Sequence, residues 1–249
     1  AGVGQPEPHA AAGRRPPLPD RRRRHRLHDR RERGLADLDG LASLGLPILE
    51  DACQAVGARS SGGFSGAHGY AGAYSFNGGK NVPSGEAGAL VTNSSKVAER
   101  ARLLMNHGEN FNQSSVGYNY RPSELTCCVA YHGLLELEER NARRQALASE
   151  FYGQPVRKDH VYYCMPFKVS MEREKFIKRM AKRGVHVGGG YIRPSLNHYK
   201  AFRKYAKHSL PVVDDLSTRS LCLLYDMTPD KPLGYGSEVR EKVLECLKR

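Results

Sequence analysis

The residues of this chain with the clearest chemistry are a lysine on a glycine loop and an aspartate at the end of an apolar run. Lys80 follows Gly78 and Gly79, and Asp51 ends a run that begins at Leu44. An uncharged lysine amine attacks an aldehyde to form a Schiff base, and lysine loses its charge readily when it is desolvated. A carboxylate that faces a pyridine nitrogen keeps that nitrogen protonated. The pair therefore suits a cofactor that carries an aldehyde on a pyridinium ring, such as pyridoxal 5'-phosphate (PLP).

The phosphate of such a cofactor needs hydroxyl and backbone N–H donors, and Ser75 lies shortly before Lys80 on the same segment. The two glycines between them allow the backbone to approach a ligand closely. Taken alone, Lys80 is more often a solvated turn lysine, because lysine is rarely buried without a partner. Asp51 alone is more often the N-cap of a helix. Only the ordered set Asp51, Gln54, Ser75 and Lys80 outweighs these ordinary interpretations.

Three stretches in this order resemble the DegT/DnrJ/StrS family of sugar aminotransferases. They are residues 50–58 (EDACQAVGA), 74–81 (YSFNGGKN) and 85–92 (GEAGALVT). Further matches are residues 106–108 (NHG), 117–125 (GYNYRPSEL) and 191–198 (YIRPSLNH). Together these motifs are specific, although each alone is weak, and the resemblance runs from about residue 34 to the C-terminus.

The resemblance implies a role for five residues. Lys80 would bind PLP as a Schiff base and then move a proton between the substrate and cofactor carbons. Asp51 would pair with the pyridinium nitrogen, and Gln54 would lie near the ring and its phenolic oxygen. Ser75 would bind the phosphate, and Asn119 would reach the phosphate in the neighbouring subunit's site, because the family is dimeric with shared sites.

The chain also departs from the family pattern. Family members carry a long section before the stretch that contains Asp51, and it supplies a phosphate-binding helix N-terminus and a ring-stacking aromatic residue. The first fifty residues here offer no candidate for either. Cys53 stands where alanine is usual, and Ala87 replaces a glycine. His107 and Arg121 match family positions, but we assign them no catalytic role.

The implied activity is transfer of an amino group from glutamate or glutamine to a keto-sugar or keto-cyclitol, in amino-sugar or secondary-metabolite biosynthesis. The implied partners are these small molecules and a second copy of the chain, in the cytoplasm, without membrane or nucleic acid. One alternative is a catalytically inactive fragment of such an enzyme. Another is a nucleic-acid-binding protein that uses its basic N-terminal arm.

That arm is rich in arginine and proline. Residues 1–40 hold ten of the arginines and carry +4 of the net charge of +13. Prolines and charges without apolar periodicity predict disorder over residues 1–33. An arm for an acidic partner, a solvated tail and a segment outside the native reading frame all remain open, and the abrupt change to family-like sequence near residue 34 favours the last.

The alternation of strand and helix patterns predicts an α/β chain of PLP-dependent transferase fold type I. We expect an incomplete large domain with a mixed sheet at 34–152 and a smaller C-terminal α/β domain at 153–249. Predicted strands are 46–49, 71–76, 89–92, 161–169, 185–187 and 221–224. Predicted helices are 95–106, 123–151, 172–183 and one that begins at Ser237.

Two expectations concern burial. In the 123–151 helix, Leu125, Val129 and Leu135 recur at helical spacing, which predicts an inward face. The six cysteines lack the spacing of a metal site or a disulfide framework, so we expect mostly buried free thiols and no metal.

Overall fold

The computed structural model contains two compact units, residues 1–46 and 47–249. The residues that it describes are 38–60, 63–109, 115–189, 194–206, 208–225 and 227–248. In the first unit these include one short helix, α2 (Leu38–Ala42). The arm at residues 1–33 lies outside the described residues, so its disorder stays a prediction.

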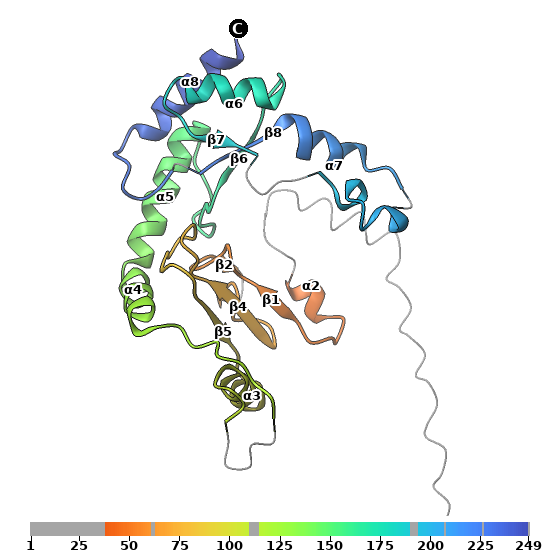
Figure 1. Cartoon of the computed structure of the whole chain (residues 1–249). Helices are drawn as coiled ribbons and strands as arrows, with labels where there is room; N and C mark the ends of the chain where they lie inside the picture. Colours follow the sequence, from red (N-terminus) through yellow and green to blue (C-terminus); the bar gives the residue numbers. More distant parts are fainter. Residues whose placement is uncertain are drawn as a thin grey trace, which may run out of the picture. The chain divides into compact units, whose positions relative to one another are not determined.

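The second unit begins with a three-stranded mixed sheet in the order β1–β4–β5 (Figure 1). β1 (Leu49–Asp51) runs parallel to β4 (Ala71–Ser75), and β4 runs antiparallel to β5 (Gly88–Val91). A two-stranded antiparallel hairpin, β2 (Arg59–Ser60) with β3 (Gly63–Phe64), lies between β1 and β4 in the chain. The parallel pair brings the carboxyl ends of β1 and β4 to one edge of the sheet, where α/β proteins bind ligands.

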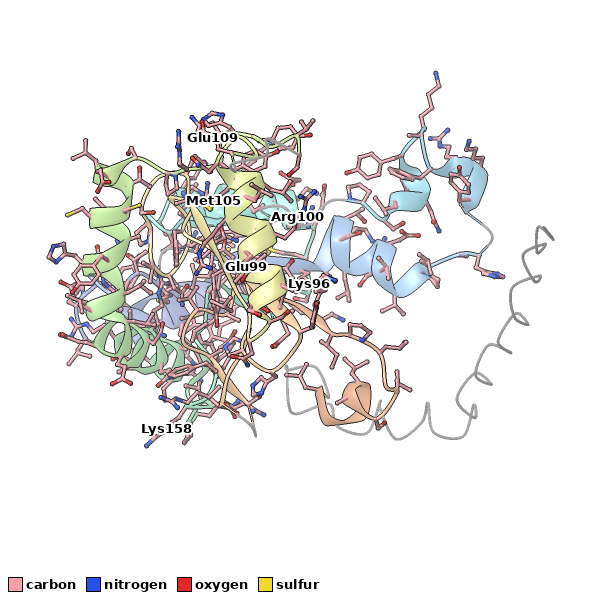
Figure 2. The ribbon with its side chains drawn as sticks, turned by 90° about the horizontal axis from the view of Figure 1, so that it is seen from below. Lys96, Glu99, Arg100, Met105, Glu109 and Lys158 are labelled. Carbon is pink, nitrogen blue, oxygen red and sulfur yellow. The ribbon has the colours of Figure 1, made fainter. Side chains whose placement is uncertain are left out.

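Two serines begin the helices that follow this sheet. The Ser94 hydroxyl accepts the N–H of Val97 at 3.4 Å and caps α3 (Ser95–Met105). The Ser123 hydroxyl accepts the N–H of Thr126 at 3.2 Å and caps α4. Each bond satisfies one of the N–H groups that a helix start leaves free. None of the residues of α3 is buried, and Figure 2 shows several of its side chains along the helix.

The helix predicted over residues 123–151 is two helices, α4 (Glu124–Leu135) and α5 (Leu137–Tyr152). Between them Glu136 has a φ of −92° and a ψ of 3°, outside the helical region. α5 ends at Gly153, whose φ of 67° is left-handed and suits a residue without a Cβ.

A second three-stranded sheet is formed by the C-terminal half of the chain. Its order is β6–β8–β7, with both pairs antiparallel. The strands are β6 (Met165–Lys168), β7 (Val187–Gly188) and β8 (Leu221–Leu224). The helices are α6 (Arg173–Ala181), α7 (Pro211–Asp215) and α8 (Tyr235–Leu247), with shorter turns at Leu196–His198, Arg203–Tyr205 and Leu216–Ser220.

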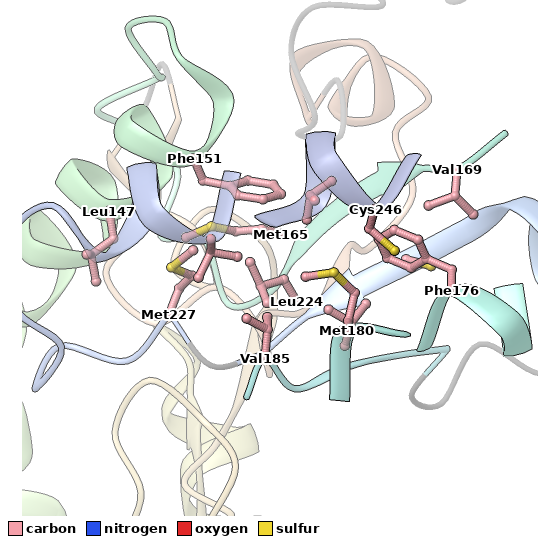
Figure 3. Close-up of a cluster of buried hydrophobic side chains, with 14 of the residues drawn as sticks. Leu147, Phe151, Met165, Val169, Phe176, Met180, Val185, Leu224, Met227 and Cys246 are labelled. Atoms are coloured by element: carbon pink, nitrogen blue, oxygen red, sulfur yellow. The ribbon is translucent and has the colours of Figure 1, made fainter. Parts of the chain in front are cut away.

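The main hydrophobic core joins this second sheet to α5, α6 and α8. Phe176, Met180 and Leu224 are fully buried in it, and Figure 3 shows them with Phe151 and Met165 in one cluster. The core around the first sheet is much smaller. It contains four buried residues, which are Val56, Phe76, Val82 and Ala130.

Several predictions about burial are wrong. Leu125, Val129 and Leu135 were expected to face inward, but their exposed fractions are 81%, 54% and 66%. The strand predicted as buried over 46–49 is β1, and its first residue, Leu49, is 75% exposed. Helical spacing shows which residues share a face, but it does not show that another element covers that face.

All six cysteines are free thiols, as predicted, but only Cys222 and Cys246 are buried. Cys127 and Cys128 lie exposed on α4, so the expectation of mostly buried thiols is wrong. Among the described residues, no three His, Cys, Asp or Glu side chains gather as potential metal ligands. Within the same residues, none of the helices combines the length and apolarity needed to cross a bilayer.

Candidate active site

Two of the predicted site residues lie at the carboxyl edge of the first sheet. Asp51 is the last residue of β1 and stands opposite Ala73 of β4 in the register. Ser75 is the last residue of β4, two positions further along. Its hydroxyl accepts the N–H of Asn77 at 3.4 Å and is half-buried. A carboxylate and a hydroxyl therefore end neighbouring parallel strands at the same edge.

The Asp51 carboxylate is held in its ionised form. Its Oδ1 accepts the backbone N–H of Cys53 at 3.1 Å. The pKa of Asp51 lies below its ordinary value of 3.8, first because of the Cys53 thiol, then because of the Cys53 N–H, and further because of the positive charge of Lys80. The charge of Lys80 makes the smallest of these contributions.

The Cys53 thiol has one proton and two acceptors within reach. Its sulfur lies 3.7 Å from the carbonyl oxygen of Ala73, and it also acts on the Asp51 carboxylate. Burial raises the pKa of the Cys53 thiol, and the neighbouring carboxylate raises it further. The side chain therefore stays a neutral thiol and a hydrogen-bond donor at the place where the family usually has alanine.

Lys80 lies on the loop between β4 and β5. The loop is shaped by Asn77, whose carbonyl accepts the Lys80 N–H at 2.9 Å and whose Oδ1 accepts the Gly79 N–H at 3.1 Å. A Cβ added at Gly78 would meet no atom within 4 Å, so the loop is open on that side. The half-buried Lys80 side chain carries its Nζ to 4.9 Å from the ring centroid of Tyr163.

The residue after Lys80 fixes this loop to the rest of the second unit. Asn81 is 3% exposed, and its Nδ2 donates to the Asn141 Oδ1 at 3.2 Å and to the Val161 carbonyl at 3.1 Å. Asn141 in turn donates to the Val56 carbonyl at 3.2 Å. The Asn81 Nδ2 thus bonds to two other segments and fixes the backbone beside Lys80, because losing the partners of a buried donor is costly, while the buried Asn81 Oδ1 has no hydrogen-bond partner among the described residues.

Glu50 is a second positioning residue that we did not predict. One of its carboxylate oxygens accepts the N–H groups of His68 at 2.7 Å and Gly69 at 2.6 Å, and the other accepts that of Gly66 at 2.7 Å. Charge-assisted bonds of this kind are about twice as strong as neutral ones. They attach the end of β1 to the turn before β4 and so fix the backbone next to Asp51.

The other two predicted residues, Gln54 and Asn119, are both exposed. Gln54 is exposed in the turn that follows β1. Asn119 is exposed and forms an isolated β-bridge with Asn106 at the end of α3. The Arg121 Nε donates to the Asn119 Oδ1 at 3.3 Å, and the Arg121 guanidinium also contacts Asn106 and His107.

The group at the sheet edge fits PLP. It offers an ionised carboxylate for a ring nitrogen, an amine for an aldehyde and a hydroxyl for a phosphate, all beside an open glycine loop. The role of Asp51, Ser75 and Lys80 in holding it stays a prediction.

Curated relatives match about half of the chain. The dTDP-3-amino-3,4,6-trideoxy-alpha-D-glucose transaminase of Streptomyces venezuelae is 42% identical over 123 residues, which are 47% of this chain and 32% of the relative. The erythromycin biosynthesis sensory transduction protein EryC1 of Saccharopolyspora erythraea is 42% identical over 123 residues, 47% of this chain and 34% of that protein. The chain thus spans about a third of the length of these relatives.

Solved structures share the fold over more of the chain. DesV of S. venezuelae has a TM-score of 0.76 and 30% identity, and the match covers 86% of this chain and 62% of DesV. An aminotransferase from Brucella abortus gives a TM-score of 0.75 at 22% identity, with the same coverage of 86% and 62%. These likenesses confirm the predicted α/β fold of PLP-dependent transferases.

The family model of the DegT/DnrJ/EryC1/StrS aminotransferases matches residues 35–231. This range includes both sheets and every residue predicted for the site. Because the match covers most of the chain, the protein belongs to the DegT/DnrJ/EryC1/StrS aminotransferase family.

Proposed function

We propose that this chain acts as a PLP-dependent aminotransferase that moves an amino group from glutamate or glutamine to a keto-sugar or keto-cyclitol. Membership of the family supports the reaction class. The name of the S. venezuelae relative, which specifies a dTDP-linked amino sugar, supports a sugar-like acceptor. Within the chain, the proposal depends on one observation, that Asp51 and Ser75 end neighbouring parallel strands at one edge of the sheet, with Lys80 on the loop that follows Ser75.

Each residue of the group then has one task. PLP supplies an aldehyde that carries the amino group and a ring that withdraws electrons from the reacting carbon. Lys80 holds the cofactor through its amine and moves the proton, and Asp51 keeps the ring nitrogen protonated. Ser75 donates to the phosphate, and Gln54 lies beside the ring.

The first experiment asks whether Lys80 is the amine that PLP selects. The full chain is incubated with PLP, reduced with borohydride and digested, and the modified lysines are identified by mass spectrometry. We expect the adduct on Lys80 and its loss in Lys80→Ala. Lys96→Ala, which removes an exposed lysine of α3, is the control and should leave the adduct unchanged (Figure 2). Equal labelling of many lysines in both variants would refute the proposal.

The second experiment separates cofactor binding from chemistry. Asp51→Asn removes the charge that holds the ring nitrogen protonated but keeps the shape of the side chain. We expect Asp51→Asn to keep the adduct on Lys80 and to lose about 10²–10³-fold in the rate at which glutamate is converted to 2-oxoglutarate. An unchanged rate would exclude Asp51 as the partner of the ring.

We also propose that the protein works as a homodimer in which Asn119 serves the partner's site. The exposure of Asn119 and its contacts at the end of α3 support this role. Lys80→Ala and Asn119→Ala would each be inactive alone. Refolded together, they should regain about a quarter of the wild-type activity, because one site in each mixed dimer is intact. No regain would assign Asn119 to its own subunit's site or to no site.

A further inference from the structure

The ring of Tyr163 lies beside the amine on which the proposed function depends. The Lys80 Nζ is 4.9 Å from the centroid of this ring, and both side chains are half-buried. Tyr163 comes from the segment before β6, about eighty residues further along the chain. We infer that Tyr163 is a positioning residue that holds the resting Lys80 ammonium group beside its ring, where the amine is placed for the cofactor aldehyde once the ammonium has lost its proton. This inference rests on the proposed function.

The segment that carries Tyr163 is bonded directly to the loop of Lys80. The buried Asn81 amide donates to the carbonyl of Val161 at 3.1 Å, only two residues before Tyr163. This bond from the Asn81 side chain to the Val161 backbone places the segments of Lys80 and Tyr163 side by side. The contact between the Lys80 amine and the Tyr163 ring therefore depends on this hydrogen bond as well as on the length of the lysine side chain.

The turn before Tyr163 is held in an unusual conformation. Tyr162 has a φ of 45°, in the left-handed region that few residues other than glycine occupy. Its N–H donates to the His160 Nδ1 at 3.0 Å, and its hydroxyl accepts the Arg157 N–H at 3.0 Å. Such a conformation persists only where the surroundings determine it. The direction in which the chain presents Tyr163 is therefore fixed.

The charge distribution around the ring suits a cation. The face of an aromatic ring is negative and attracts an ammonium group within about 6 Å of the centroid. Burial raises the pKa of the Tyr163 phenol, so the ring is neutral and keeps this polarity. The charge of the buried Arg144 also acts on Tyr163. A lysine stem has four carbons and many rotamers, so a fixed attraction at its tip limits where the amine lies.

The test compares two substitutions at the same position. Tyr163→Phe keeps the ring, and Tyr163→Leu removes it while keeping an apolar side chain. Tyr205→Leu is a matched control, because the Lys204 Nζ also lies 4.9 Å from a tyrosine ring centroid, that of Tyr205.

The first readout is the initial rate of borohydride-trapped PLP adduct at Lys80. We expect Tyr163→Phe to match the wild type and Tyr163→Leu to be about threefold to tenfold slower at Lys80, with no change at Lys204. Tyr205→Leu should leave the rate at Lys80 unchanged. An equal or faster rate in Tyr163→Leu, or a Tyr163→Phe rate as slow as that of Tyr163→Leu, would overturn the inference.

The second readout needs no cofactor and so separates this inference from the proposed function. Lysines are reductively methylated with ¹³C-formaldehyde, and their methyl resonances are assigned by NMR. In the wild type, the ring current of Tyr163 should shift the Lys80 methyl resonances upfield of those of Lys96. This displacement should persist in Tyr163→Phe and vanish in Tyr163→Leu. Its absence from the wild type would overturn the inference even if Tyr163→Leu failed to fold.

If PLP shows no preference for Lys80 while the ring displacement is present, the proposed function fails. The position of the amine over Tyr163 then still stands. If PLP selects Lys80 and the displacement is absent, the proposed function stands and the role of Tyr163 fails.

Discussion

The two sheets of the larger unit are held in different ways. The second sheet packs its apolar side chains against α5, α6 and α8, where Phe176, Met180 and Leu224 are fully buried. The cluster beside the first sheet has four buried residues, and Leu49 and Leu90 on the strands of this sheet are 75% and 53% exposed. The sheet that carries the candidate site is thus the one with less apolar burial.

What positions the first sheet is a set of polar contacts. The Glu50 carboxylate accepts three backbone N–H groups, and the Asn81 amide donates to two other segments. Hydrophobic burial is non-directional, whereas a hydrogen bond fixes the relative position of two groups. Apolar burial around the second sheet therefore supplies most of the stability, and a few directed hydrogen bonds around the first sheet place the site.

The largest expected effect tests the difference in burial. Phe176→Ala should lower the free energy of unfolding by about 3–5 kcal/mol, because it leaves a cavity in the second core. Leu125→Ala on the exposed face of α4 should change it by less than about 0.5 kcal/mol. Urea denaturation measures both. If Leu125→Ala were as costly as Phe176→Ala, the face of α4 would be covered in solution and the contrast in burial would be lost.

A change of intermediate size in the free energy of unfolding tests the polar contacts of Glu50. Glu50→Ala should cost about 1–3 kcal/mol, because three N–H groups lose a charged acceptor. Hydrogen exchange should become faster at Gly66, His68 and Gly69, while Phe176 in the second core stays protected. The control is Glu99→Ala, which removes an exposed carboxylate of α3 (Figure 2). Unchanged exchange at the three amides would mean that Glu50 does not hold the turn.

The smallest effect concerns the protonation of Asp51. Cys53→Ala removes the thiol, the first cause of the lowered pKa, and keeps the backbone N–H. The pKa of Asp51 should therefore rise toward its ordinary value, as measured by NMR titration of its carboxyl carbon. Cys127→Ala on the exposed face of α4 is the control and should leave this pKa unchanged.

The lowered pKa of Asp51 also determines how the free energy of unfolding changes with pH. Because folding lowers the pKa of Asp51, its contribution is present above the pKa of the unfolded chain and is lost as the pH falls through the folded value. In Cys53→Ala this contribution should be smaller, so acid should destabilise the variant and the wild type by more similar amounts. A larger acid sensitivity in Cys53→Ala would contradict the assignment to the thiol.

Local patterns predicted some regular elements of the second region, but the strand predicted over 161–169 is only Met165–Lys168, and α7 was missed. The apolar run Leu221–Leu224 is β8, and the amphipathic segment around Phe176 is α6. Here a short apolar run or a helical repeat also determines which side is buried. The hairpin of β2 and β3 was missed, because its two-residue strands are too short to produce a periodic pattern.

The site was predicted only in part. The ordered motifs predicted Asp51, Ser75 and Lys80, of which the fold brings Asp51 and Ser75 to one sheet edge, with Lys80 on the loop that follows. They did not identify Glu50, Asn81 or Tyr163 as positioning residues, although the first two stand next to Asp51 and Lys80 in the quoted motifs. The partners of Glu50 and Asn81 lie 16 to 80 positions away, and no local pattern encodes a contact of that range.

The bonds of Asn81 also give the order in which the site is completed during synthesis. Its partners, Asn141 and Val161, lie 60 and 80 residues later in the chain. A ribosome adds about 5–20 residues per second, so Lys80 is made several seconds before the groups that fix its loop. A nascent chain that ends before Val161 contains Lys80 but lacks the Val161 carbonyl that helps to fix its loop. Under the proposed function, cofactor binding at Lys80 therefore follows the synthesis of Val161.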